Sequence, residues 1–364
     1  MQPKCICFFN SNKAWGGGEK WHFENALLAR DRGYRVCVVT NLVSVLADRI
    51  EHEPGIMLLR IHIGNTSFLN PGTLWRLACF YRQHAVEAVI MALPSDMKAG
   101  GIAAKLAGVR DIIYRRGIAV PVRNSALNRF LFKHVLTKLI ANSRNTLDCL
   151  LADNNQLIEP QRTHLINCGF DVAAFDAMPA QPLVQRKPGE ILIGNAGRLT
   201  PQKGQKLLID IAKILKDQPI PFRVLIAGTG EMEAELNNYA REQGVEDVVE
   251  FLGFVSDMKS FHQAIDIFAL TSLWEGFCYV QVEAMTLKRP VVAWNVSSIP
   301  EVVTDGETGY LCSVLNTAEF AARLLTLIRD EALRERLGES GRARVIAHFE
   351  MRKTFADLEN CLQA

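Results

Sequence analysis

The chain has 364 residues, which is more than one ordinary domain holds and suits two domains of roughly 150–200 residues each. Hydrophobic residues make up 49% of the chain and charged residues 22%, a composition that excludes intrinsic disorder as the main state. No uncharged apolar run reaches the roughly 18–20 residues that cross a bilayer, and the start of the chain lacks the apolar core of a secretion signal. The nine cysteines include no Cys-x-x-Cys pair, which predicts reduced thiols in a cytoplasmic protein.

The two halves of the chain differ in charge. Residues 1–170 carry a net charge of +9 and residues 171–364 a net charge of −7. Opposite signs predict two domains with different partners. A basic first half suits phosphates, an anionic acceptor or a membrane surface.

Strand-like and helix-like runs alternate along the first half. Helical stretches separate most of the predicted strands, which are short and apolar. These strands are residues 5–9, 35–40, 56–63, 88–93, 111–114 and 138–141. This alternation is typical of a mostly parallel sheet with helices on both faces.

The alternation pauses at residues 173–189, which hold three prolines, and we predict an interdomain linker there. It then restarts, and a helical tail is predicted from about residue 317. The strands predicted in the second half are residues 190–194, 222–227, 249–252, 265–270 and 290–294. We therefore predict an α/β protein of two Rossmann-like, doubly wound domains, residues 1–172 and 190–348, facing a cleft that holds the site.

Three glycines follow the first strand, in the run Trp15-Gly-Gly-Gly-Glu19. Glycines at a helix start allow close approach of the backbone and offer free N–H groups to an anion. A flexible turn without a ligand would look the same in the sequence.

A second loop opens the second domain, Gly197-Arg-Leu-Thr-Pro-Gln-Lys-Gly204. Arg198 and Lys203 lie between a predicted strand and a helix start, which suits a diphosphate whose leaving-group charge must be stabilised. The loop is not a Walker loop, because the Gly-x-x-x-x-Gly-Lys-Ser/Thr pattern is absent.

A third motif, Glu275-Gly-Phe-Cys-Tyr-Val-Gln-Val-Glu283, follows a predicted strand. Gly276 permits a tight turn, and a helix beginning near Cys278 would direct N–H groups at a negative ligand. Glu283 could accept hydrogen bonds from a ribose diol, and Glu275 could reach a reacting sugar. On spacing alone, two solvated carboxylates are the simpler interpretation.

The order of these motifs resembles family 4 of the retaining nucleotide-sugar glycosyltransferases, the glycosyl transferases group 1, which have the GT-B fold. Further segments support the resemblance: residues 140–143, 167–171, 227–231 and 300–311. It covers nearly the whole chain and is most specific from residue 195 to residue 311.

The resemblance implies roles for residues of both domains. Arg198 and Lys203 would bind the donor diphosphate, and Glu283 the ribose. Glu275 and the amides of Gly276, Phe277 and Cys278 would hold the donor sugar. The backbone of Gly228, Phe254 and Val255 would border the nucleotide. Gly17 and Gly18 would approach the phosphates from the first domain, on which the final helix, about residues 349–364, would pack.

One position departs from the family pattern. Many members carry a first-domain histidine in a turn that matches Tyr114-Arg-Arg-Gly117, and Arg116 stands near that place here. Such a histidine contacts the donor sugar, whereas an arginine could hold a phosphate or an anionic acceptor. No Asp-x-Asp metal motif occurs, and the Gly-x-Gly of residues 228–230 does not extend to a dinucleotide fingerprint.

We therefore expect a metal-independent, retaining glycosyltransferase without a cofactor. Its donor would be a nucleoside-diphosphate sugar, UDP- or GDP-linked, and its acceptor a glycan or lipid-linked hydroxyl in lipopolysaccharide or cell-envelope polysaccharide biosynthesis. It would be cytoplasmic, with contact to an anionic membrane through the basic domain and no nucleic-acid partner. The alternatives are a nucleotide-sugar epimerase of the same fold and a non-catalytic nucleotide-sugar-binding protein.

Overall fold

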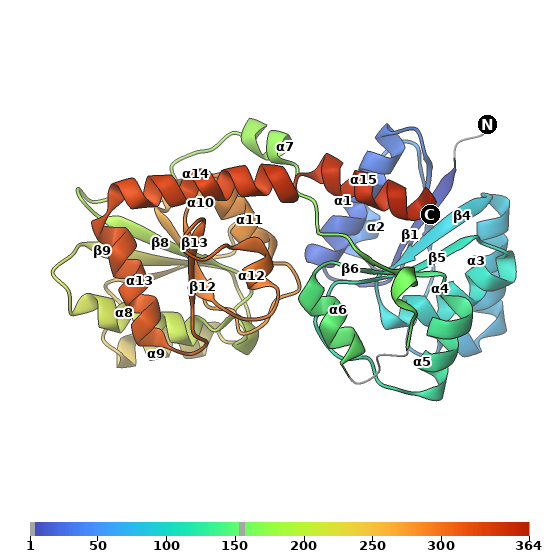
Figure 1. Ribbon diagram of the computed structural model, residues 1–364, viewed down its shortest axis with the longest axis horizontal. Coiled ribbons are helices and arrows are strands. Elements are labelled where there is room, and N and C mark those ends of the chain that lie inside the picture. The colour runs from blue at the N-terminus through green and yellow to red at the C-terminus, as the bar shows by residue number, and fades with distance from the viewer. Residues whose placement is uncertain (1–3, 153–156, 364) are drawn as a thin grey trace. The chain divides into compact units, whose positions relative to one another are not determined.

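Two parallel β-sheets, one in each half of the chain, organise the fold (Figure 1). The computed structural model describes residues 4–152 and 157–363, which group into two units. The first unit comprises the chain up to residue 169 together with the residues from 352 onward, and the second comprises residues 170–351. The predicted pair of doubly wound α/β domains is confirmed.

The first sheet has seven strands. Their bounds are β1 Cys5–Asn10, β2 Arg35–Thr40, β3 Ile56–Arg60, β4 Val86–Met91, β5 Asp111–Arg116, β6 Lys138–Ala141 and β7 Thr163–Leu165. They lie in the order β3-β2-β1-β4-β5-β6-β7, and neighbouring strands pair in parallel. The order reverses between β1 and β4, and open α/β sheets bind ligands at the carboxyl ends of the strands at such a point.

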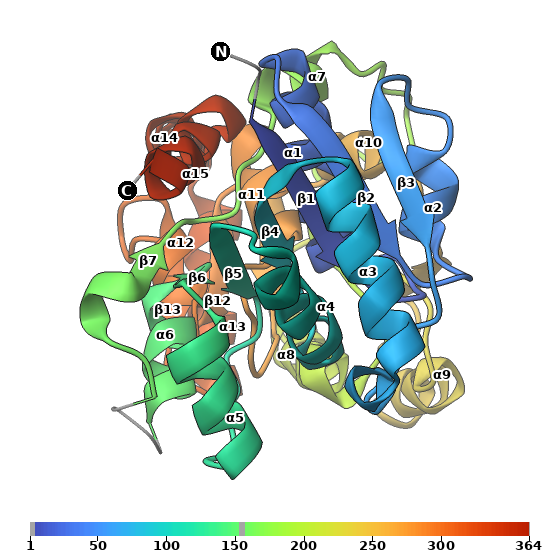
Figure 2. The same cartoon turned by 90° about the vertical axis from the view of Figure 1, so that its right-hand side faces the viewer.

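Helices cover both faces of this sheet. Their bounds are α1 Gly17–Asp31, α2 Val45–Ile50, α3 Pro71–Gln83, α4 Pro94–Ala107, α5 Ala126–Phe130, α6 Arg144–Leu151 and α15 Met351–Gln363, with shorter turns η1 Ser67–Leu69, η2 Leu131–Val135 and η3 Pro160–Arg162. Figure 2 shows α3 and α4 over one face of the sheet.

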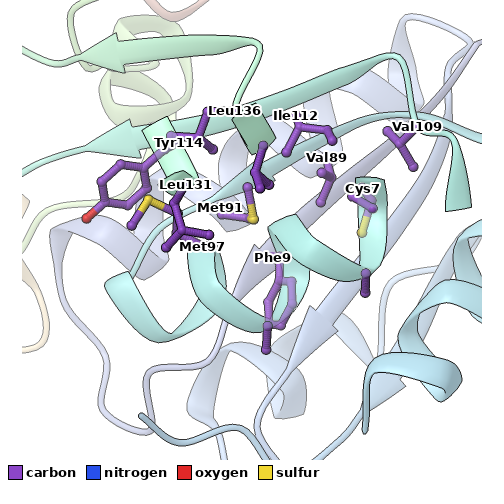
Figure 3. Close-up of a cluster of buried hydrophobic side chains, with 14 of the residues drawn as sticks. Cys7, Phe9, Val89, Met91, Met97, Val109, Ile112, Tyr114, Leu131 and Leu136 are labelled. Carbon is purple, nitrogen blue, oxygen red and sulfur yellow. The ribbon is translucent and has the colours of Figure 1, made fainter. Parts of the chain in front are cut away.

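Side chains of β1 alternate between the two faces, as the pleat of a strand requires. Cys7 and Phe9 point into the core under α4 (Figure 3). Phe8 points to the opposite face, where its ring meets that of Trp21 from α1 at a centroid distance of 6.2 Å. A strand buried on both faces has a continuous apolar sequence, which is why β1 was predicted from residues 5–9.

The last helix, α15, packs on the first unit. Glu359 pairs with Arg32 at 2.7 Å, and the ring of Phe355 contacts that of Tyr34. Lys138 Nζ donates to the carbonyl oxygen of Cys361 at 2.6 Å. The chain therefore returns, after the whole second unit, to complete the first.

The second sheet has six strands in the order β10-β9-β8-β11-β12-β13, again paired in parallel. Their bounds are β8 Ile191–Ala196, β9 Phe222–Ala227, β10 Val249–Gly253, β11 Ile267–Leu270, β12 Val291–Trp294 and β13 Gly309–Cys312. The surrounding helices are α7 Val172–Ala177, α8 Gln205–Lys216, α9 Glu233–Glu242, α10 Met258–Ala264, α11 Tyr279–Thr286, α12 Ile299–Val302, α13 Thr317–Arg329 and α14 Glu331–His348, with the turn η4 Pro201–Lys203.

Residues 173–189, where a linker was expected, pack along the second unit. They begin within α7, where Asp176 pairs with Arg342 of α14 at 2.5 Å. Further along, Gln181 N donates to Ser260 Oγ at 2.8 Å, and the carbonyl of Gln185 accepts from Arg223 at 2.7 Å. The prolines of this segment interrupt regular structure, but its backbone polar groups find partners on the second unit.

Candidate functional site

Most of the predicted site residues lie at the carboxyl edge of the second sheet. The loop after β8 carries Arg198 and Lys203, and the loop after β11 carries the segment from Glu275 to Cys278. Gly228 follows β9, and Phe254 follows β10. The strand order reverses between β8 and β11, the point at which open α/β sheets bind ligands.

Hydrogen bonds join the loop after β8 to the loop after β11. The side-chain amide of Gln202 donates to the Trp274 carbonyl at 2.8 Å. Its backbone carbonyl oxygen accepts from the Leu273 amide, also at 2.8 Å. The backbone at Gly204 has a φ of 63°, and a Cβ there would lie 2.2 Å from the carbonyl oxygen of Thr271. Glycine is therefore required after Lys203 for the two loops to touch.

Lys203 and Glu275 form an ion pair across these loops. Nζ lies 2.6 Å from Oε1, and the side chains are 19% and 8% exposed. Burial alone would lower the pKa of Lys203, but its ion pair with the Glu275 carboxylate opposes this, and the pKa lies above its ordinary value. The sequence predicted both residues at a ligand, and the structure brings them into direct contact.

Arg198 is held differently from Lys203. Its side chain is exposed, and no described acid forms an ion pair with it. Nearby, the loops after β8 and β9 touch, because a Cβ at Gly228 would lie 1.9 Å from the Gly197 carbonyl oxygen. The edge thus carries one paired and one exposed cation, an arrangement suited to an anion with several oxygens.

The segment after Glu275 leads into helix α11. Cys278 precedes the helix with a φ of 65°, and burial, reinforced by Glu275, raises the pKa of its thiol well above the ordinary value. Phe277 is buried, and its ring packs against those of Tyr279 and Phe349. The thiol is therefore neutral at physiological pH, and the ring of Phe277 is occupied by packing.

Glu283 lies in α11 and is 7% exposed. Its Oε2 is 3.5 Å from Nε2 of His262, a fully buried residue of α10 whose ring packs against Phe268. His262 was not predicted from the sequence, because it belongs to no motif and a histidine on an apolar helix face is more often a core residue. Phe254 contrasts with this pair, since it is 77% exposed, and Val255 beside it is half-buried.

The first unit carries the other predicted residues at the carboxyl edge of its own sheet. Gly17 and Gly18 form the first turn of α1, and a Cβ at Gly18 would meet no atom within 4 Å. Arg116, the last residue of β5, donates to Tyr114 Oη at 3.0 Å and to the Val120 carbonyl at 2.9 Å. Its guanidinium is therefore tied to neutral groups of its own unit.

Two buried ionisable residues at this edge were not predicted. Asp96, at the start of α4, accepts from the amides of Ser11 and Leu93 at 3.3 and 3.0 Å, yet burial raises its pKa to about 7. His22 in α1 contacts the Gly18 carbonyl at 2.9 Å through Nδ1, and burial, aided by Arg115, lowers its pKa to about 3. Neither residue belongs to a motif that the sequence could reveal.

Potential metal ligands do not cluster in the described residues: no group of three or more His, Cys, Asp or Glu side chains is arranged to hold an ion there. Among the helices of residues 4–152 and 157–363, none combines the length and apolar character needed to cross a bilayer.

Two parallel α/β domains with this polar carboxyl edge define the GT-B class of architecture. Anabaena Alr3699/HepE, solved in complex with UDP and glucose, matches with a TM-score of 0.80 over 99% of both chains at 23% identity. The glycosyltransferase of Rickettsia africae matches with a TM-score of 0.87 over 100% of this chain and 98% of its own, at 17% identity. These similarities establish the fold.

Residues 181–344 match the family described as Glycosyl transferases group 1, so the resemblance to group 1 is confirmed for that part of the chain. The capsular polysaccharide biosynthesis glycosyltransferase CapM of Staphylococcus aureus is 32% identical over 46% of this chain and 45% of its own length. The chain spans 40–60% of the length of the first five curated relatives that it matches.

Proposed function

We propose that this protein is a retaining glycosyltransferase that moves a sugar from a nucleoside-diphosphate sugar to an acceptor hydroxyl. The observation that carries the proposal is the pairing of charged Lys203 with Glu275 beside exposed Arg198, at the reversal point of the second sheet. The family match of residues 181–344 and the UDP and glucose bound by Anabaena Alr3699/HepE support it and favour UDP over GDP.

In the proposed reaction the bond between the sugar C1 and the diphosphate oxygen breaks, and the acceptor oxygen bonds to C1. The acceptor proton passes to the departing phosphate. Arg198, Lys203 and the first turn of α11 stabilise the negative charge that grows on that phosphate. Attack from the face that the diphosphate leaves would retain the anomeric configuration without a protein nucleophile.

The remaining predicted residues take supporting roles in this proposal. Glu283 holds the ribose, the exposed ring of Phe254 with Val255 borders the base, and Glu275 with the amides that follow it holds the sugar. Arg198 and Lys203 supply two positive charges at the diphosphate, so we propose that donor binding needs no divalent metal.

The acceptor is proposed to be an anionic or lipid-linked glycan of lipopolysaccharide or another envelope polysaccharide, met by a cytoplasmic enzyme at the inner face of a membrane. The support is the net charge of +9 over residues 1–170 and the role of CapM in capsular polysaccharide biosynthesis. Arg129, Phe130 and Lys133 form an exposed basic and aromatic spot on that unit.

A thermal-shift screen against UDP-, GDP-, ADP- and TDP-sugars, with and without EDTA, tests the donor assignment. A ligand at 100 times its dissociation constant stabilises the folded state by about 2.7 kcal/mol. We expect a shift with one nucleotide, unchanged by EDTA and lost in Glu283→Ala. Absence of a shift with all four would contradict the proposal, and a shift abolished by EDTA would contradict metal independence.

Product analysis separates the alternatives. Transfer releases the nucleoside diphosphate and links the sugar to an acceptor. An epimerase would change the donor sugar without any acceptor, and a binding protein would give the thermal shift but no turnover over a broad panel of glycan acceptors.

A further inference from the structure

Strained backbone is concentrated around Glu275. Among the described residues, five other than glycine have a left-handed backbone: Ala85, Cys278, Lys288, Ser297 and Leu315. Ala85 and Lys288 come two residues after the last residues of α3 and α11, where this conformation is an ordinary way to end a helix. Cys278 instead lies in the loop after β11, three residues beyond Glu275, and Ser297 lies in the loop after β12.

Ser297 and Ser298 both bind the main chain of Glu275. Ser297, with a φ of 56°, donates Oγ to the Glu275 carbonyl oxygen at 2.6 Å. Ser298, which is 1% exposed, donates to the same oxygen at 3.0 Å. Two consecutive hydroxyls therefore satisfy both lone pairs of one carbonyl in the candidate site.

The carboxylate of the same residue is also fixed, through its 2.6 Å contact with Lys203. Glu275 is thus held at the carbonyl by the loop after β12 and at the carboxylate by the loop after β8. A serine in the left-handed region costs conformational energy that glycine would avoid, and such strain persists where the surrounding structure enforces it, often at functional sites.

We propose that Ser297 and Ser298 are positioning residues for Glu275, and that the strained backbone of Ser297 serves the site rather than the fold. This inference rests on the proposed function. The two hydroxyls set the orientation of the Glu275–Gly276 peptide, and that peptide directs both the carboxylate toward Lys203 and the following amides toward the donor sugar. The serines need not touch the donor themselves.

Substitutions at the two serines separate strain from hydrogen bonding. Ser297→Ala keeps the strain and loses the hydroxyl, whereas Ser297→Gly loses both. Ser298→Ala loses the second hydroxyl without a change in strain, and Ser298→Thr keeps it. Leu315→Gly is the matched control, because Leu315 has a φ of 66° and is 59% exposed, in the loop between β13 and α13.

Three quantities are measured for each variant: the melting temperature, the affinity for UDP, and the rate of UDP release from UDP-glucose by transfer to water. If another sugar nucleotide gives the larger wild-type thermal shift, it replaces UDP-glucose. We expect Ser297→Ala, Ser297→Gly and Ser298→Ala to lower the rate about 10- to 100-fold, as misplaced catalytic groups do, with UDP affinity unchanged.

The melting temperature is expected to follow a different order. Ser297→Gly should melt about 2–4 °C above Ser297→Ala, because it relieves the strain, yet be no faster. Ser298→Thr should keep the wild-type rate, and Leu315→Gly should gain stability at an unchanged rate.

Wild-type rates in folded Ser297→Ala and Ser298→Ala would overturn the inference while leaving the proposed function intact. Rates that rise with melting temperature, so that Ser297→Gly exceeds Ser297→Ala, would show a purely structural role. Wild-type protein that binds none of the tested nucleotides or sugar nucleotides would overturn the proposed function and the inference together.

Discussion

Arg198 and Lys203 are both cations of the candidate site, but the fold holds them in different ways. Arg198 is exposed and forms no ion pair with a described acid, whereas Lys203 is largely buried against Glu275. Substitutions at the two positions therefore have different consequences for stability, and this difference can separate binding chemistry from structural support.

Arg198→Ala should lower turnover without loss of stability. Removing one donor that stabilises developing charge costs about 10²- to 10³-fold in rate. An exposed side chain away from packed contacts changes the free energy of unfolding by less than about 0.5 kcal/mol. Steady-state kinetics and urea unfolding of the same preparation provide the check, and a normal rate would remove Arg198 from the proposed mechanism.

Lys203→Met should destabilise the second unit, because it leaves the Glu275 carboxylate buried without its partner. Breaking a buried pair from one side costs about 3–5 kcal/mol, whereas replacing both partners can be nearly neutral. The double variant Lys203→Met/Glu275→Gln should therefore regain stability but not turnover, as measured by urea unfolding and kinetics.

The exposed pair Lys206–Glu235, with atoms 3.7 Å apart and side chains 48% and 58% exposed, is the matched control. The same double-mutant cycle there should give a coupling of no more than about 1 kcal/mol. Equal coupling energies at the two pairs would mean that the Lys203–Glu275 contact is an ordinary surface interaction.

The pairing itself could not be read from the sequence. Arg198 and Lys203 were predicted from their residue types and their place after a predicted strand, and Glu275 from the family resemblance. The contact between Lys203 and Glu275 depends on β8 and β11 being neighbours, which the spatial order of the strands decides. Asp96 and His22 were missed because burial, rather than a motif, gives them their unusual ionisation.

At the level of elements, short edge strands were also missed. β7 and β13 have three and four residues and lie at the ends of their sheets, where half-exposed positions dilute the apolar signal. The inner strands are buried on both faces and were predicted within a few residues of their bounds.

The starts of α1 and α4 carry opposite pH dependences. Asp96 has a folded pKa of about 7 against about 3.9 when unfolded, so between these values only the folded state keeps the proton and stability falls as pH rises. His22 has a folded pKa of about 3 against about 6.5 when unfolded, so only the unfolded state binds a proton there and stability falls as pH decreases.

Single substitutions should separate the two effects. Relative to wild type, Asp96→Asn should gain stability as pH rises from about 4 to 7, and His22→Gln should gain stability as pH falls from about 6.5 to 4. Urea unfolding at several pH values, with hydrogen exchange to assign the transition to the first unit, measures both. Asp148→Asn, at an exposed position, is the control and should follow wild type.

At the level of the whole molecule, the charge asymmetry leads to the membrane proposal. Helix α5 and the turn η2 carry several basic side chains on the first unit. Their residues Leu131, Phe132 and Val135 are buried in the core of the first unit, which leaves Phe130 exposed among basic neighbours. Contact with a membrane would therefore rely on charge more than on an inserted apolar face.

We expect the protein to sediment with anionic vesicles at low ionic strength and to be released by salt, since surface charges are screened within about 3 Å at 1 M. Arg129→Glu/Lys133→Glu should weaken sedimentation, whereas Lys213→Glu on the second unit should not. Binding to neutral vesicles, or binding that salt leaves unchanged, would contradict an electrostatic contact.

The return of α15 to the first unit affects how the protein is made. During synthesis the first unit lacks α15 until the residues of the whole second unit have been translated. The two segments that join the units are themselves bonded, Phe170 N to the Phe349 carbonyl at 2.7 Å and Met351 N to the Phe170 carbonyl at 3.0 Å. The unit that begins the chain therefore cannot complete its fold before the second unit has been translated.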